Sequence, residues 1–295
     1  MATSQACAAV SYKTILLATD FLSSSEAALP YVLSLARSFD SSVLVASAVP
    51  FQKLGGFAAV PPIVDVDFGW EDAIEAMQVF KDKHPFAGVR HEFLLERGDP
   101  REVIANLVQN RAVDLVVVGS HGRHGLHKLL IGSVAEQIFR TVRCPVLTIG
   151  PKVEPSLGES WQPRRILFAT EFAEGSIHAL PHALAVADAN HGELLVLYAI
   201  PLVLFEKQSE MYRQFRQRLE DLISEQPPHI CTVKSEVCFD LPAQGILDTA
   251  RKREVGLIVM GVHHAHFARM GAHVPGSIAC EVIDNAPCPV LTVRN

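Results

Sequence analysis

The chain contains an internal repeat, which restricts its possible folds more than any other feature of the sequence. Residues 15–36 read ILLATDFLSSSEAALPYVLSLA, and residues 166–187 read ILFATEFAEGSIHALPHALAVA, so the two copies align without a gap. Residues 144–148 and 288–292 both read Cys-Pro-Val-Leu-Thr. Each copy spans about 140 residues, which is the size of one domain rather than of a solenoid unit. The repeat therefore predicts two domains in tandem.

The composition marks a boundary between the two copies. Residues 151–162 read PKVEPSLGESWQ and are rich in Pro, Gly and Ser, as linkers commonly are. We expect one domain over residues 1–150 and the other over residues 163–295. The chain has 295 residues, of which 49% are hydrophobic, so each domain can bury a core of its own.

Short apolar runs alternate with helical patterns in each copy. This alternation favours parallel strands joined by right-handed crossovers, with helices on both faces of the sheet. Pro30 and its counterpart Pro181 would interrupt a helix, so a kink or a later helix start is expected there. The predicted fold class is α/β, with two tandem doubly wound five-stranded parallel sheets of the Rossmann-like type. In the first copy we expect strands at residues 14–18, 43–49, 89–96, 114–119 and 145–149.

The composition also excludes several classes of partner. The net charge of −6 does not support a nucleic-acid surface, which requires a basic patch. No apolar run is long enough for a membrane span, and the first residues lack the basic and apolar segments of a signal peptide. The six cysteines form no C-x-x-C pair, which is typical of reduced thiols. We expect a cytoplasmic protein that binds neither nucleic acid nor membrane.

A glycine-rich loop follows the fourth expected strand. The apolar run 115–118 ends at Gly119, and Gly122, Gly132 and Ser133 complete the pattern G-x2-G-x9-G-S before a helical segment. Glycines let the backbone approach an anion, and free N–H groups at a helix start point toward it. The pattern matches neither the P-loop nor the dinucleotide motif G-x-G-x-x-G. It predicts a phosphate cradle, although glycines that serve only turns would give the same spacing.

Asp20 follows the first expected strand, as Gly119 ends the fourth. In sheets of this type, ligands bind beyond the carboxyl ends of the strands, where the strand order reverses. If the first and fourth strands are neighbours at that point, Asp20 and Gly119 face one crevice.

Together, these segments resemble the universal stress protein family. The resemblance rests on the strand ends Ala-Thr-Asp-Phe and Val-Val-Val-Gly, the glycine loop and the closing Cys-Pro-Val-Leu-Thr segment, and it covers nearly the whole chain twice. It implies a five-stranded parallel sheet between helices, and ATP, with or without Mg²⁺, as the ligand. Family members commonly dimerise through the last strand, so the two halves are expected to make that pairing internally. A homodimer of whole chains and unidentified protein partners stay open.

The resemblance also implies roles for individual residues of the first half. Thr19 and Asp20 lie near the nucleoside, and the strand end at Ala48 offers backbone groups to the adenine. The phosphate path is lined by residues of the glycine loop, namely Gly119, His121, Gly122 and Arg123. The start of the following helix closes on the phosphates through Gly132, Ser133 and Val134. The residues alone leave simpler interpretations open, in which Asp20 caps a helix and Arg123 is a solvated charge.

The second half departs from this pattern. Gly261 corresponds to Gly119, but His264 replaces Gly122 and Glu171 replaces Asp20. A side chain is unfavourable where the backbone must approach an anion, so weaker or absent ATP binding is expected here. Several histidines crowd this loop, but no cysteine or carboxylate has metal-ligand spacing to them, so no metal site is expected.

Three functions are compatible with the sequence. The first is an ATP-binding protein with a regulatory or stress-response role and no strong catalysis. The second is a slow ATPase or phosphotransfer enzyme, although the carboxylate pair that would hold metal ions is not evident near the loop. The third is a dimer-like scaffold that binds no nucleotide. The intact glycine loop of the first half favours the first function.

Overall fold

The computed structural model of the chain describes residues 10–21, 23–50, 69–119, 133–154, 161–201, 208–262 and 277–294. The elements of the first half are β1 (Thr14–Ala18), α1 (Ser23–Glu26), α2 (Leu29–Phe39), β2 (Ser42–Val49), α3 (Trp70–Lys83), β3 (Arg90–Arg97), α4 (Pro100–Asn110), β4 (Leu115–Gly119), α5 (Ser133–Thr141) and β5 (Val146–Ile149). Those of the second half are β6 (Arg165–Ala169), α6 (Glu174–Ile177), α7 (Leu180–Ala189), β7 (Glu193–Ile200), α8 (Gln208–Ser224), β8 (Thr232–Phe239), α9 (Pro242–Lys252), β9 (Leu257–Val262), α11 (Ile278–Asn285) and β10 (Val290–Arg294). The expected strands of the first half are all present, each within one residue of its expected bounds.

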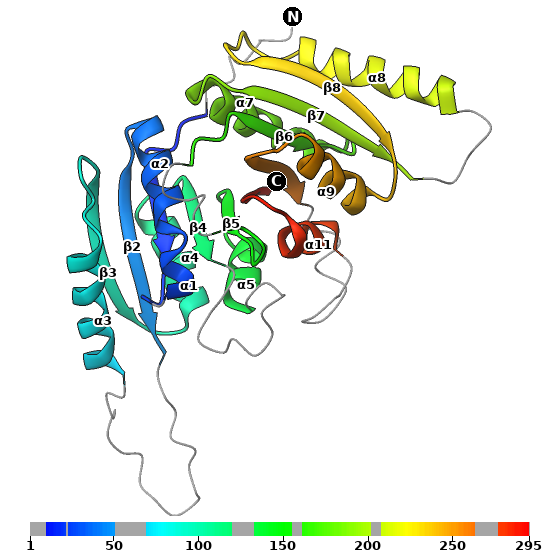
Figure 1. The fold of residues 1–295 in the computed structure, drawn as a ribbon. Coiled ribbons are helices and arrows are strands. Elements are labelled where there is room, and N and C mark those ends of the chain that lie inside the picture. Colours follow the sequence, from blue (N-terminus) through cyan, green and yellow to red (C-terminus); the bar gives the residue numbers. More distant parts are fainter. Residues whose placement is uncertain are drawn as a thin grey trace, which may run out of the picture.

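All these strands belong to one ten-stranded sheet, in the order β3-β2-β1-β4-β5-β10-β9-β6-β7-β8 (Figure 1). Within each half the strands are parallel, which confirms the predicted pair of doubly wound five-stranded sheets. The halves meet where β5 pairs antiparallel with β10, and Leu147 lies opposite Leu291 at the middle of this junction. The last strands of the two halves therefore make the expected internal pairing, and this pairing merges the two sheets into one.

The sheet lies between two hydrophobic cores because side chains alternate along each strand. In β1, Ile15 and Leu17 belong to one core and Leu16 belongs to the other. The first core is covered by α2, α3, α7 and α8, and the second by α4, α5, α9 and α11. Each core contains residues of both halves, so the apolar packing continues across the junction. Among the described residues, no helix has both the length and the apolar character needed to cross a membrane.

Prolines define where the first long helix of each half begins. Pro30 lies in the first turn of α2 and Pro181 lies in the first turn of α7, with a four-residue helix before each. Proline is tolerated there because the first N–H groups of a helix have no intrahelical acceptor. The later helix start that the sequence indicated is confirmed.

Trp161, just before β6, connects the second half to the first. Its indole Nε1 donates to the carbonyl of Gly256 at 2.9 Å. Its carbonyl accepts a hydrogen bond from Ser34 of α2 at 2.5 Å, and its ring lies edge-on to that of Tyr31, with centroids 5.1 Å apart. The end of the expected linker, residues 151–162, is therefore packed against α2.

Candidate functional site

The strand order reverses at β1 and β4, which are neighbours in the sheet. Ala18 pairs with Val118, so Asp20 and Gly119 both lie at the carboxyl ends of adjacent strands. After β1 the chain continues through α1 into α2, which covers one face of the sheet, and after β4 it continues toward α5, which covers the other. Such a point opens a crevice between the two connections. The first and fourth strands are thus neighbours, which is the condition under which Asp20 and Gly119 were expected to face one crevice.

A tight turn after β1 holds Asp20 in place. The N–H of Thr19 donates to the carbonyl of Ala46 in β2 at 2.9 Å. Phe21 has a φ of 57°, an unusual value for a bulky residue, and its N–H donates to Oγ1 of Thr19 at 2.9 Å. The carboxylate of Asp20 accepts a hydrogen bond from Oγ of Ser25 in α1 at 2.7 Å. Asp20 is half-buried. Its carboxylate is therefore held by a hydrogen bond to the short helix that follows it.

The structure brings part of the predicted site together. Ala46 pairs with Ala18, so Ala48 lies two residues further along β2, beside the turn that contains Thr19 and Asp20. Gly119 is the last residue of β4, and α5 begins at Ser133 with Val134 as its second residue. Outside the described residues lie His121, Gly122, Arg123 and Gly132.

Sequence reasoning missed Ser25, although the repeat contains a signal for it. Thr19 and Ser25 recur as Thr170 and Ser176, six residues apart in both copies. All four side chains are buried, between 3% and 8% exposed. A hydroxyl pair that is repeated and buried beside a carboxylate position indicates a hydrogen-bonded unit rather than a solvated turn.

In the second half, the glycine that corresponds to Gly119 has a packing role. A Cβ on Gly261, the counterpart of Gly119, would lie 2.3 Å from the carbonyl oxygen of Gly175 and 2.5 Å from Cα of Ser176. Both are backbone atoms of α6, so no side chain fits between β9 and this helix. The glycine at this position allows the short helix to contact the strand, whether or not a phosphate is present.

The second crevice differs from the first in its polar groups. Glu171 is exposed, whereas Asp20 is half-buried. The hydroxyl of Ser277 accepts a hydrogen bond from the N–H of Cys280 at 3.1 Å and so caps α11. The histidines of this half's loop lie outside the described residues.

Four of the described cysteines have little nucleophilic character. Burial raises the pKa of Cys144, Cys231 and Cys288 to about 12 and that of Cys238 to about 11. The thiolate is the reactive form of cysteine, and it is scarce at neutral pH for thiols with such pKa values. These side chains therefore act as small apolar groups of the core.

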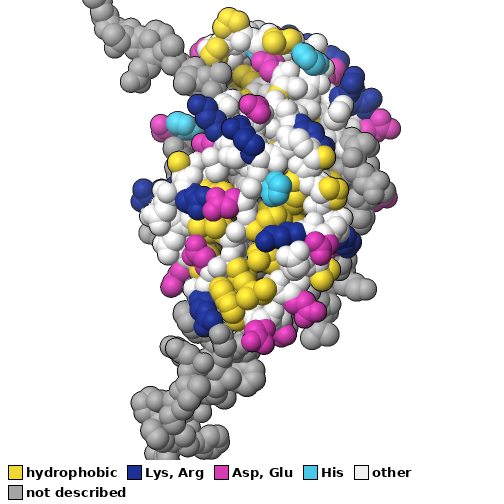
Figure 2. All heavy atoms as spheres, turned by 90° about the vertical axis from the view of Figure 1, so that its left-hand side faces the viewer, with side chains coloured by type: hydrophobic (Ala, Val, Ile, Leu, Met, Phe, Trp, Pro, Cys, Tyr) yellow, Lys and Arg dark blue, Asp and Glu magenta, His cyan; other side chains and the backbone are white. Residues whose placement is uncertain are grey.

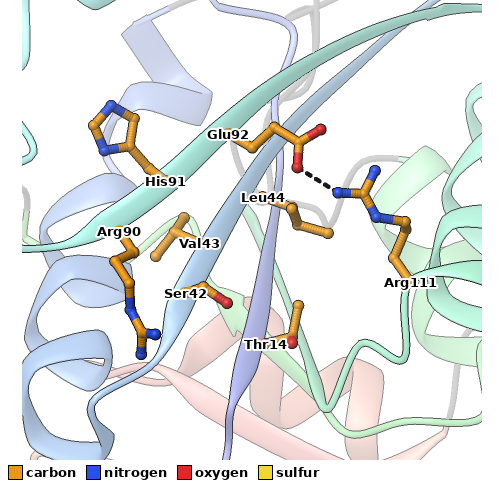
Figure 3. Close-up of a pocket in the computed structure, with 8 residues that line it drawn as sticks. All are labelled: Thr14, Ser42, Val43, Leu44, Arg90, His91, Glu92 and Arg111. Carbon is orange, nitrogen blue, oxygen red and sulfur yellow. Dashed lines mark hydrogen bonds and ion pairs between the residues drawn. The ribbon is translucent and has the colours of Figure 1, made fainter.

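A pocket of about 260 Å³ lies at the other end of the strands from Asp20, beside the first residues of β1, β2 and β3 (Figure 3). Arg111 points toward Glu92 and forms an ion pair with it, and Arg90 donates to the carbonyl of Asp40 at 3.0 Å. The two arginines are thus engaged with acceptors of the protein itself. The pocket is separate from the crevice and offers an anion little uncompensated charge.

The face around the outer strand β3 carries apolar side chains between charged ones (Figure 2). Ile74 and Val79 of α3 are 44% and 58% exposed. Lys81 lies over the ring of Phe93, with its Nζ 4.7 Å from the centroid, and Arg97 lies over Trp70. Charges along an edge strand oppose pairing with another sheet.

The fold and the crevice define an α/β protein of two doubly wound domains paired through their last strands. The sequence pattern of the Universal stress protein family matches residues 11–150 and 163–294, so the chain belongs to this family.

Individual relatives agree with this assignment. Universal stress protein MJ0531 of Methanocaldococcus jannaschii is 32% identical over 151 residues, which are 48% of this chain and 85% of that protein. A universal stress protein from Archaeoglobus fulgidus has a solved structure that superposes with a TM-score of 0.74 at 23% identity, covering 95% of this chain and 98% of that one. For a protein from Pseudomonas aeruginosa UCBPP-PA14 the TM-score is 0.63 at 18% identity, over 96% of this chain and 93% of that one. At these identities the two structures support the fold alone.

Proposed function

We propose that the first half binds one molecule of ATP at the carboxyl ends of β1 and β4, and that this occupancy serves a regulatory or stress-response role without strong catalysis. The observation that carries the proposal is the position of Asp20 and Gly119 at the ends of adjacent strands, where the sheet order reverses. Ligands of doubly wound sheets bind at this point. The pattern G-x2-G-x9-G-S, which resembles the ATP-binding loop of the family, begins at the end of β4.

The described groups fit a nucleoside. Asp20 is an anchored carboxylate, which suits the hydroxyl and amino donors of a ribose or adenine. Thr19 lies beside it, and the backbone at Ala48 is proposed to meet the adenine edge. For the phosphates, ATP would bring its negative charge, with or without Mg²⁺, to the start of α5, where N–H groups and the helix dipole favour an anion. The residues proposed for that contact are Gly119, His121, Gly122, Arg123, Gly132, Ser133 and Val134.

The second half is proposed to act as a structural partner with weak or no ATP binding. Its carboxylate, on Glu171, is longer and exposed, and the hydroxyl of Ser277 is engaged with its own helix. The second half pairs its strand β10 with β5 of the first half, and its apolar residues extend both cores. The dimer-like arrangement is thereby complete within one chain.

The test is to purify the full chain without added nucleotide, denature it, and identify and count the released nucleotide. We expect about one adenine nucleotide per chain, or uptake of one ATP per chain by calorimetry if the site is empty after purification. Gly122→His copies the second half and should abolish binding. The ratio of ATP to ADP released reports on slow hydrolysis.

A matched pair of variants assigns the site to one half. Asp20→Ala should weaken ATP binding, whereas Glu171→Ala, at the same position of the second copy, should leave it unchanged. Absence of released nucleotide together with absence of ATP uptake would contradict the proposal and favour the scaffold. Equal losses in both variants would contradict its assignment to the first half alone.

A further inference from the structure

A chain of hydrogen bonds ends on the carboxylate of Asp20. The N–H of Phe21 donates to Oγ1 of Thr19 at 2.9 Å, and Oγ1 of Thr19 lies 2.8 Å from Oγ of Ser25. Ser25 donates its proton to Oδ1 of Asp20 at 2.7 Å. A hydroxyl has one proton, so Thr19 is the donor to Ser25. Hydrogen bonds in such a chain polarise one another, and the last one, to a charged acceptor, is the strongest.

The second half repeats the first links of this chain but ends it elsewhere. The N–H of Phe172 donates to Oγ1 of Thr170 at 3.0 Å, and Thr170 lies 3.0 Å from Ser176. Ser176, however, donates its proton to the carbonyl of Ala173 at 2.8 Å. Its single proton is therefore committed to the backbone of the turn. Among the described residues, a bond from this serine to the carboxylate is found in the first half alone.

The two turns have a similar backbone at the residue that follows the carboxylate. Phe21 and Phe172 have φ values of 57° and 61°, so both copies adopt the same strained conformation. Ser25 and Ser176 are also buried to the same degree, at 5% and 3% exposure. What differs is the carboxylate, which is one carbon longer and exposed in Glu171. The bond from the serine to the carboxylate therefore goes with the shorter and less exposed side chain of Asp20.

We propose that Ser25 is a positioning residue, which orients the carboxylate of Asp20 toward the nucleoside part of the ligand. This inference rests on the proposed ATP site and adds a residue and a specificity to it. Because Ser25 acts through Asp20, its contribution concerns the nucleoside and not the phosphates. A binding group whose orientation is fixed in advance loses less conformational freedom when the ligand arrives.

The experiment measures ATP and inorganic tripolyphosphate binding to the full chain, stripped of nucleotide, by calorimetry. Ser25→Ala removes the hydrogen bond to a charged group, and we expect ATP to bind about tenfold more weakly while tripolyphosphate binding is unchanged. Ser25→Cys keeps a side chain of similar size with a weak donor, and it should show the same split if Ser25→Ala fails to fold. Ser176→Ala is the matched control and should change neither affinity. In an Asp20→Ala background, Ser25→Ala should cause no further loss.

The possible failures can be told apart. A wild-type chain that binds no ATP would overturn the proposed function and this inference with it. A wild-type chain that binds ATP, with Ser25→Ala and Ser25→Cys binding equally well, would overturn the role of Ser25 and leave the ATP site intact. An equal loss of ATP and tripolyphosphate affinity, or additive losses with Asp20→Ala, would show general distortion of the turn instead of positioning.

Discussion

The hydroxyl of Tyr12 and Nδ1 of His182 are joined by a hydrogen bond of 2.9 Å that connects the two halves of the chain. Their rings are stacked, with centroids 5.9 Å apart. Burial raises the pKa of Tyr12 and lowers the pKa of His182 to about 4, so a neutral phenol meets a neutral imidazole. At the matching positions of the repeat, Tyr31 replaces His182 and Pro163 replaces Tyr12. The hydroxyl of Tyr31 is buried, and it has no hydrogen-bond partner among the described residues.

This asymmetry predicts opposite effects of the same substitution. Tyr12→Phe leaves the ring nitrogen of His182 without its partner, so the free energy of unfolding should fall by about 1–3 kcal/mol. Tyr31→Phe removes a hydroxyl that already lacks a partner, and it should be neutral or stabilise by up to about 1 kcal/mol. Urea unfolding of both variants measures the difference. Equal destabilisation would show that the hydroxyl of Tyr31 is satisfied in solution.

The same contact predicts a pH dependence of stability. The pKa of His182 is about 4 in the folded chain and near 6.5 when unfolded, so the unfolded state binds more protons between these values. The stabilisation linked to the neutral imidazole is complete above pH 6.5 and is lost as the pH falls toward 4, by at most about 3 kcal/mol. His182→Gln keeps an amide that can bond to Tyr12 but does not titrate. The difference in unfolding free energy between wild type and this variant should shrink from pH 7 to pH 4.5, and a constant difference would contradict the assignment.

Much of the architecture follows from local sequence patterns. Apolar runs located the strands of the first half, Pro30 indicated a later helix start, and Asp20 and Gly119 were expected after the first and fourth strands. That these two strands are neighbours comes from the structure. The resemblance supplied the pairing of the last strands. The strand and helix positions depend on periodicity or on backbone restrictions that act within a few residues, and the repeat provides these patterns twice.

Other features depend on how the two halves pack together and on which acceptor a hydroxyl group bonds to. Tyr12 and His182 are 170 residues apart, and no periodicity connects them. Thr19 and Ser25 are identical to Thr170 and Ser176, yet among the described residues only Ser25 of the two serines donates to a carboxylate. The packing role of Gly261 was also hidden, because a glycine before a loop suggests a phosphate as readily as a nearby helix. The loop residues 120–132 lie outside the described residues, so their predicted contacts stay predictions.

A further prediction concerns the start of α9. In the first half, Asp99 caps α4 by accepting from the N–H of Arg101 at 2.9 Å, and the hydrogen bonds from Arg101 lower the pKa of Asp99 to about 2. The matching N-cap of α9 is Leu241, which is 65% exposed, has extended backbone angles and makes no side-chain cap. Leu241→Ser should therefore stabilise the chain by about 1 kcal/mol, because serine accepts from the first turn without placing a second carboxylate beside Asp240. Leu241→Ala removes the same side chain without adding a cap, and a gain in thermal stability equal to that of the serine variant would contradict the capping explanation.

The final prediction separates the packing role of the loop glycine from any role in ligand binding. Gly261→Ala places a methyl group against the backbone of Gly175 and Ser176, so the chain should lose about 3 kcal/mol of stability while the number of ATP molecules bound per chain stays the same. Gly245→Ala is the contrast, because its Cβ would meet side-chain atoms instead of backbone, namely Sγ of Cys238 at 2.8 Å and Cβ of Ala199 at 3.3 Å. Gly245 lies inside α9, where alanine is favoured over glycine by about 1 kcal/mol, so this variant should lose less stability than Gly261→Ala. If Gly261→Ala unfolds at the same urea concentration as wild type, contact with α6 does not require a glycine at the end of β9.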